Sequence, residues 1–207
     1  MRDRVIRDEI HKDIFVPANH AKIIDTREFQ RLRSIQQLST CEYVFPAANH
    51  NRFSHSLGAY HLARTLITSL NEVQPNLVSE DDGELICLAA LLHDIGHPPF
   101  SHLLETPEVF ATYHSHEHWG RVLLESEDTE VGIALLEVLG VQRRNRLFAL
   151  MDGDSEYDGI AIPPYMKEIV SSQLDVDRMD YMVRDQANTG AQIGGFDIAR
   201  VIRALRV

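Results

Sequence analysis

Apolar side chains recur every three or four residues along most of the chain, and this spacing restricts the fold more than any other feature. Two such stripes are formed by Leu85, Leu88, Ala89 and Leu92, and by Ala59, Leu62 and Leu66. The period is that of one face of an α-helix, whereas no segment alternates apolar and polar residues as a half-buried strand would. We therefore predict an all-α fold in which the helices pack as a bundle.

Capping residues divide this pattern into separate helices. Thr26 is placed to cap one helix, and Ser79 with Asp82 to open another that ends near residues 93–94. The later predicted helices cover residues 117–126, 130–139, 143–151, 164–187 and 197–207. The predicted loops are residues 40–51 and residues 152–159, the second of them a mobile surface loop.

The composition is that of one globular domain. The chain has 207 residues, of which 44% are hydrophobic and 25% are charged, and this length allows a sizeable core. No run of about 18 apolar residues occurs, and the charged N-terminus is unlike a secretory signal, so we expect a cytoplasmic protein without a membrane partner. Cys41 and Cys87 form no disulfide or zinc-ligand pattern. A formal net charge of −11 argues against non-specific nucleic-acid binding, which requires a basic face.

Three separated segments carry side chains that suit a metal ion. His55 lies on the predicted buried face of a helix, His93 and Asp94 are adjacent at a helix end, and Asp177 follows much later. A single histidine is more often a solvated or core residue, but these occur together with carboxylates. Imidazole and carboxylate ligands favour a divalent ion that can activate water. Manganese, iron, zinc, nickel and cobalt all remain open, and magnesium is a poorer match to two histidines.

The segment after residue 175 places polar groups on one helical face. The residues that share this face are Asp177, Tyr181, Arg184 and Asp185. An amphipathic core helix would place leucines there, so the face is either a salt-bridged surface or the wall of a polar cavity. Because apolar residues remain for packing on the opposite side, we favour the cavity.

The candidate metal ligands lie within a series of longer sequence motifs that occur in a defined order. The motifs are residues 24–26, 29–33, 44–47, 50–53, 55–58, 93–97, 99–102 and 175–178. Together they resemble the HD-domain metal-dependent phosphohydrolases, and within them the deoxynucleoside triphosphate triphosphohydrolase branch, over roughly residues 4–207. The resemblance implies an HD-domain helical bundle with a metal site in its core. It implies one domain over residues 1–207, as the N-terminal catalytic part of a longer architecture.

The resemblance also implies a reaction and roles at the centre. The family cleaves deoxynucleoside triphosphates between the α-phosphorus and the sugar oxygen, releasing a deoxynucleoside and inorganic triphosphate. His97 and His116 match the acid–base histidines, which suits imidazole near neutral pH. Glu105 stands where an aspartate commonly supports the catalytic histidine, and Glu117 competes for that role. The implied metal ligands are His55, His93, Asp94 and Asp177.

Further positions match substrate contacts of the family. Gln37 and Asp185 match the pair that reads the 3′-hydroxyl group. The family often has lysine at position 178, whereas this chain has Arg178. The ammonium point charge is therefore replaced by a planar guanidinium group that can bind two phosphate oxygens. The positions that contact phosphate and sugar are matched by Arg52, His102, Arg178 and Tyr181.

A third set of residues resembles the guanine-nucleotide activator pocket of regulated relatives. Asp25 would read guanine there; alternatively, Asp25 caps the following helix and the arginines pair with acidic neighbours. The residues that resemble this pocket are Arg4, Val5, Asp25, Gln30, Arg33 and Phe53.

Relatives continue beyond the position of Val207 with base contacts and oligomer surfaces, which implies a homo-oligomer. A chain ending at Val207 is then a minimal catalytic core, a truncated protein or one without catalytic competence.

Two other functions are consistent with the same four metal ligands. An HD phosphohydrolase could act on nucleoside monophosphates, cyclic nucleotides or another phosphoester, and Gln37 and Asp185 would then lack a role. A non-catalytic nucleotide sensor could keep the metal for folding. The acid–base histidines His97 and His116 count against the sensor.

Overall fold

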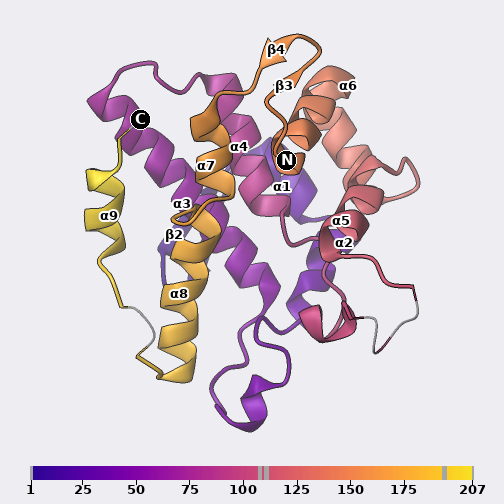
Figure 1. The fold of residues 1–207 in the computed structure, drawn as a ribbon, viewed down its shortest axis with the longest axis vertical. Helices are drawn as coiled ribbons and strands as arrows, with labels where there is room; N and C mark the ends of the chain where they lie inside the picture. The colour runs from indigo at the N-terminus through magenta and orange to yellow at the C-terminus, as the bar shows by residue number, and fades with distance from the viewer. Residues whose placement is uncertain (1, 107–108, 110–111, 193–194, 207) are drawn as a thin grey trace.

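The computed structural model describes residues 2–106, 109, 112–192 and 195–206, and their fold is mainly helical (Figure 1). The predicted all-α class is confirmed. Short 3₁₀ turns connect some of the helices, among them η1 (Arg31–Ser34), η2 (Cys41–Tyr43) and η3 (Ser101–Leu104). The α-helices are α1 (Ala18–Ile24), α2 (Arg27–Gln30), α3 (Arg52–Val73), α4 (Glu80–Leu92), α5 (His116–Glu125), α6 (Glu130–Asp152), α7 (Pro164–Val170), α8 (Val176–Thr189) and α9 (Ile198–Ala204).

Helix α3 forms the centre of the bundle and packs against both α4 and α8. In α4 every residue from Leu85 to Leu92 is buried, as expected of a helix that is apolar on all sides and must therefore lie inside the core. Apolar as α4 is, no helix in the described part of the chain has the length and apolarity needed to cross a membrane. The packing brings the start of α3, the end of α4 and the start of α8 together.

The predicted caps explain where two of these helices begin. The Ser79 side chain accepts a hydrogen bond from the Asp82 amide at the start of α4, as predicted. At α2, Thr26 occupies the N-cap position without capping, because its hydroxyl donates to the carbonyl of Ile23 at 2.7 Å. Helix α4 ends at Leu92, so His93 and Asp94 lie where the chain leaves the helix.

An N-terminal hairpin was not predicted. Strands β1 (Arg4–Asp8) and β2 (Lys12–Val16) pair antiparallel, with Ile6 opposite Ile14. In β2, Ile14 and Val16 are buried while Phe15 between them is 60% exposed. Three consecutive apolar residues concealed this alternation in the sequence, although the side chains follow the two-residue period of a strand.

The predicted surface position of residues 152–159 is correct, since these residues are exposed except for the half-buried Tyr157, but the segment is not an irregular loop. The last residue of α6 is Asp152, and the chain then forms a second hairpin from β3 (Glu156–Tyr157) and β4 (Ile160–Ala161). Between these strands, Asp158 and Gly159 both have positive φ angles, 52° and 74°. An Asp-Gly pair in this conformation favours a tight hairpin turn.

The predicted helices at residues 130–139 and 143–151 are both present within α6, where Gly140, with φ 69° and ψ 174°, interrupts the helix between them. One predicted helix requires correction. The predicted helix at residues 164–187 is instead two helices, α7 and α8. The chain breaks between them because Asp175 adopts an extended conformation and its carboxylate accepts the amide hydrogens of Ser172 and Arg178. This cap directs the first turn of α8.

Gly58 occupies the closest approach between α3 and α8. A β-carbon at this position would lie 1.8 Å from Asp180 Oδ1 and 2.6 Å from an Arg184 nitrogen. Alanine normally favours a helix interior, but we expect Gly58→Ala to lower the free energy of unfolding by about 1–3 kcal/mol through overpacking. The matched control is Gly83→Ala in α4, where the nearest atom is 3.7 Å away, and which should raise stability by about 0.5–1 kcal/mol. Urea unfolding measures both, and equal stabilisation by the two variants would contradict this packing.

Candidate metal centre and adjoining cavity

The four predicted metal ligands converge from three helices. His55 lies in the first turn of α3, His93 and Asp94 follow the last residue of α4, and Asp177 lies in the first turn of α8. The Nε2 atom of His55 is 3.3 Å from Nε2 of His93 and 3.1 Å from Asp177 Oδ1. Asp94 Oδ1 lies 3.4 Å from Nε2 of His93, and Asp94 Oδ2 lies 3.7 Å from Nε2 of His55. The ligand atoms of His55, His93 and Asp177 thus all lie within 4.8 Å of one another, and Asp94 lies beside the two histidines.

The opposite nitrogens of the two histidines show why these atoms suit a cation. His55 Nδ1 lies 2.8 Å from Asp180 Oδ2, and His93 Nδ1 lies 2.9 Å from the carbonyl oxygen of Ala90. Both partners are acceptors, so each Nδ1 carries a hydrogen and a neutral ring presents its Nε2 lone pair to the centre. Two lone pairs beside two carboxylates repel one another unless a cation lies between them. These residues therefore fit a divalent metal ion.

Charges at the centre adjust the pKa values of its ligands. Burial alone would lower the pKa of His55, but hydrogen bonds with Asp177 and Asp180 raise it to about 10. Burial opposes ionisation of Asp177, yet His55 and His93 hold the pKa of that carboxyl far below its usual range. Protons and a metal ion thus compete for the same lone pairs.

A buried ionic network behind His55 was missed by the sequence analysis. Asp180, which is fully buried, accepts from His55 and lies 2.6 Å from His11 Nε2. The fully buried Arg184 donates to Asp180 at 2.8 Å and to Asp8 at 3.0 Å. Arg184 was expected to share a polar face with Asp177, and its spacing of four residues from Asp180 was the available signal. The network attaches the N-terminal hairpin to the back of the centre.

Arg52 contacts Asp94, one of the candidate metal ligands. Its guanidinium donates to Asp94 Oδ2 and, through Nε, to the Ser101 hydroxyl at 2.9 Å. All three side chains are buried. Arg52 therefore places positive charge beside the centre and holds the orientation of the Asp94 carboxylate.

The two predicted acid–base histidines are stacked. The rings of His97 and His116 lie 3.8 Å apart between centroids and are inclined by 13°. Glu105 Oε1 is 3.0 Å from His116 Nδ1, and Glu117 Oε1 is 3.2 Å from His116 Nε2. Both candidate carboxylates thus contact His116, but Glu105 is largely buried whereas the Glu117 side chain is 69% exposed. His97 Nε2 lies 3.2 Å from Asp94 Oδ1, and burial, the largest effect, lowers the pKa of His97 to about 4.

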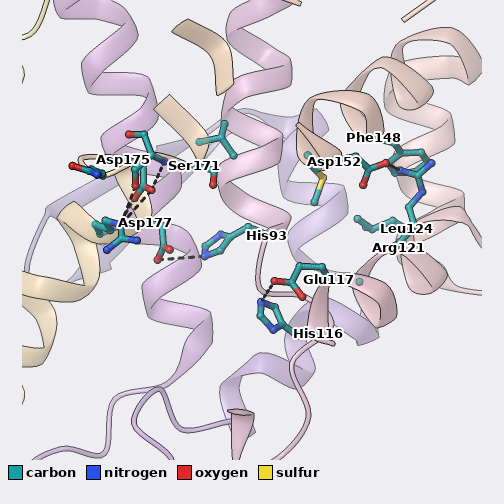
Figure 2. Close-up of a pocket in the computed structure, with 16 residues that line it drawn as sticks. His93, His116, Glu117, Arg121, Leu124, Phe148, Asp152, Ser171, Asp175 and Asp177 are labelled. Atoms are coloured by element: carbon teal, nitrogen blue, oxygen red, sulfur yellow. Dashed lines mark hydrogen bonds and ion pairs between the residues drawn. The ribbon is translucent and has the colours of Figure 1, made fainter. Parts of the chain in front are cut away.

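A cavity of about 530 Å³ opens beside the centre and the stacked histidines. Figure 2 shows Asp177 and His93 facing one another near His116, with Arg121 and Phe148 farther along the cavity wall. Arg178, a predicted substrate contact, also lines it, and its Nε donates to the Ser172 carbonyl. Sequence analysis missed the cavity residues Arg121, Leu124, Phe148, Met151, Asp152, Ser171, Ser172 and Gln173.

The predicted sugar-reading pair is linked by an intervening histidine. His50 Nε2 lies 2.7 Å from Asp185 Oδ1, and the backbone amide of Gln37 donates to the His50 carbonyl. Gln37 Oε1 and His50 Nδ1 are buried polar atoms that have no hydrogen-bond partner among the described residues. Unpaired buried acceptors and donors are costly, so this region is suited to a polar ligand group. Tyr181 is half-buried on the same helix as Asp185.

The predicted activator residues form two local groups. Arg4 holds Asp25 through two hydrogen bonds of 2.5 Å, and Val5 beside it is 57% exposed. The second group joins α2 to α3: Arg33 Nε donates to Gln30 Oε1 at 2.7 Å, and the guanidinium lies 3.6 Å from the centre of the Phe53 ring.

Histidine and aspartate ligands that meet from three helices of one bundle define a helical domain built around a metal centre. The HD domain family model matches residues 52–185, and the chain belongs to this family. The predicted resemblance to HD phosphohydrolases and their triphosphohydrolase branch is confirmed.

Known proteins resemble nearly the whole chain. An uncharacterized protein of Methanocaldococcus jannaschii is 38% identical over 202 residues, which are 98% of this chain and 38% of that protein. The human deoxynucleoside triphosphate triphosphohydrolase SAMHD1 is 38% identical over 229 residues, covering 99% of this chain and 36% of that enzyme. A solved phosphohydrolase of Bacteroides thetaiotaomicron is 33% identical with a TM-score of 0.82, covering 99% and 47% of the two chains. This chain spans less than half the length of each.

Asp180 orients the ligand His55, and we expect Asp180→Asn to weaken divalent metal binding by about 10–100-fold. The amide keeps the shape of the side chain but loses the charge that holds the Nδ1 hydrogen of His55. Titration calorimetry with Mn²⁺ measures the change, and urea unfolding verifies that the variant is folded. Asp13→Asn is the control, because Asp13 pairs with Arg7 on the exposed hairpin. Unchanged affinity in folded Asp180→Asn would contradict the orienting role.

Proposed function

We propose that this chain hydrolyses deoxynucleoside triphosphates to deoxynucleosides and inorganic triphosphate in a reaction that depends on a divalent metal ion. The observation that carries the proposal is the continuity of the centre with the cavity, because His93, Asp177 and His116 line the same space of about 530 Å³. That volume is in the usual range for small-molecule sites. The 38% identity to human SAMHD1 over 99% of this chain supports the substrate class.

The residues can be given roles in this reaction. A metal held by His55, His93, Asp94 and Asp177 would supply positive charge at the α-phosphate and activate a water molecule. Arg178 and Arg121 line the cavity and would bind the outer phosphates, while Arg52 adds charge beside Asp94. His102 and Tyr181 would contact phosphate and sugar.

Proton transfer to the leaving group is assigned to His116. Cleavage at the α-phosphorus leaves the 5′-oxygen of the sugar as an alkoxide, which needs a proton. His116 lines the cavity, and its two ring nitrogens lie 3.0 Å from Glu105 Oε1 and 3.2 Å from Glu117 Oε1. His97, stacked behind His116, connects this proton donor to Asp94 and supports its position.

The deoxyribose would be read at Gln37 and Asp185. The unpaired Gln37 Oε1 can accept a hydrogen bond from the 3′-hydroxyl group, and Asp185 is fixed by His50. A hydroxyl that satisfies a buried acceptor gains more than it would in water. This assignment accounts for two polar groups that the packing of the protein alone does not require.

The reaction predicts a specific product. With a divalent metal and deoxynucleoside triphosphates, we expect chromatography to show inorganic triphosphate, and water labelled with ¹⁸O should place the label in triphosphate. His116→Ala should reduce turnover by about 10²–10⁴-fold, the usual contribution of a general acid. His118→Ala is the matched control, because His118 is an exposed neighbour in the same helix.

Two outcomes would overturn this function. Release of orthophosphate or diphosphate would indicate an HD phosphohydrolase with a different substrate. Tight nucleotide binding without turnover under several metals, together with indifference to His116→Ala, would indicate a non-catalytic sensor.

We also propose that a guanine nucleotide activates the chain by binding at the two groups of residues that resemble the activator pocket, which are Arg4, Val5, Asp25, Gln30, Arg33 and Phe53. The support is a set of side chains suited to purine and phosphate: the Asp25 carboxylate can accept from a guanine edge, and Arg4 and Arg33 can bind phosphate. The observed pairing of Arg4 with Asp25 would then have to open.

Guanosine triphosphate should raise the turnover of another deoxynucleoside triphosphate several-fold, and Asp25→Asn should remove that increase. Asp13→Asn, which breaks a comparable pair between a strand arginine and a carboxylate, serves as the control and should keep the increase. The rate with and without guanosine triphosphate measures both. No response in the wild type, or an equal response in Asp25→Asn, would contradict the activator pocket.

A further inference from the structure

A second group of side chains that could bind a metal ion lies beside the first centre. His97 follows the end of α4, His102 lies on η3, and His116 begins α5. Together with Glu105, these residues each offer one ligand atom, and all four atoms lie within 4.8 Å of one another. None of the four belongs to the set at His55, His93, Asp94 and Asp177.

The hydrogen bonding of His97 leaves a buried lone pair at this second group. His97 Nε2 is 3.2 Å from Asp94 Oδ1, and Arg52 donates to the other oxygen of that carboxylate. Asp94 is therefore an acceptor, and Nε2 carries the hydrogen. The His97 side chain is only 1% exposed, and its Nδ1 has no hydrogen-bond partner among the described residues.

The group facing this lone pair is another acceptor. Glu105 Oε1 lies 3.9 Å from His97 Nδ1, too far for a hydrogen bond. The same carboxylate lies 3.0 Å from Nδ1 of His102 and 3.0 Å from Nδ1 of His116. All three imidazoles thus direct Nδ1 toward one carboxylate, which is the convergence that a cation requires.

The opposite nitrogens strengthen the comparison with a metal site. His97 Nε2 contacts Asp94, and His116 Nε2 contacts Glu117 at 3.2 Å. Histidine ligands in metal sites typically donate their second N–H to a carboxylate, which fixes the tautomer and the orientation of the ring. Two of the three histidines already have this arrangement, and the His102 side chain, 69% exposed, leaves a route from solvent.

We propose that His97, His102, Glu105 and His116 form a second divalent cation site of the zinc type. Three imidazole nitrogens and one carboxylate oxygen suit tetrahedral Zn²⁺, whose ligand bonds of about 2.0–2.2 Å would draw these atoms closer together. On binding, the Nδ1 hydrogen of His102 moves to its Nε2, and the Nδ1 hydrogen of His116, whose Nε2 already donates to Glu117, is released to solvent. If the proposed function holds, zinc at this site occupies the nitrogens of His97 and His116 and inhibits hydrolysis.

Zinc stoichiometry tests the site without reference to activity. The whole chain, freed of metal and titrated with ZnCl₂ in a calorimeter, should bind two equivalents, with bound zinc verified by elemental analysis after desalting. His102→Ala and Glu105→Gln should each bind one equivalent, and Asp177→Ala should keep the equivalent at the second site. His118→Ala is the control and should bind two, because it removes an exposed histidine that stacks on His114 next to the cluster.

Three results would overturn the proposal: one equivalent in the wild type, two in both His102→Ala and Glu105→Gln, or loss of an equivalent in His118→Ala. Circular dichroism verifies the fold of each variant, and the exposed position of His102 makes His102→Ala safe for the core. Failure of the proposed hydrolysis would leave these stoichiometries unchanged, so the two proposals fail separately.

Discussion

The hydrogen bond between His55 and Asp180 is the contact on which the rest of the centre depends. It fixes the hydrogen on Nδ1 of His55 and thereby directs the Nε2 lone pair toward His93 and Asp177. A buried carboxylate is costly unless it is paired, and here Arg184 supplies the opposing charge. Because Gly58 has no side chain, Asp180 and Arg184 can pack directly against α3 at this position. A ligand on one helix is thus oriented by a charge on another, and that charge needs a glycine on the first.

Buried arginines offset part of the acidic charge around the candidate centre. The formal charge is −11, so long-range attraction does not draw phosphates to the protein. Locally, Arg52 neutralises Asp94 and Arg184 neutralises Asp180. A divalent ion would offset part of the remaining acidic charge; in the cavity wall, Arg121 pairs with Glu125 and Asp152, and Arg178 donates to the Ser172 carbonyl. Without an ion the cavity lining is acidic, since Glu117, Asp152, Asp175 and Asp177 outnumber Arg121 and Arg178, so the proposed phosphate substrate would need the metal ion for binding.

Much of the fold could be predicted because it follows from local spacing, whereas the candidate metal ligands were proposed from three separated segments and a family resemblance. The stripe through α4 and the position of His55 in α3 are periodic features, and both were correct. Asp180 was missed because its role requires contacts with His11 and His55, which are distant in sequence. The cavity wall at Phe148 and Gln173 is likewise a product of packing. The break before α8 depends on a cap at Asp175 that competes with an otherwise continuous helical pattern.

The N-terminal hairpin has a consequence for how the protein is made. Asp8 contacts Arg184 across 176 residues of sequence, and His11 reaches Asp180 across 169. During synthesis, His55 and the first two strands therefore lack their partners until α8 emerges from the ribosome. Contacts of such sequence separation form late, because the loop between them must be closed first. The nascent chain thus carries His55, His93 and Asp94 before it has Asp177 and Asp180, so the candidate metal centre is complete only once the last long helix has docked.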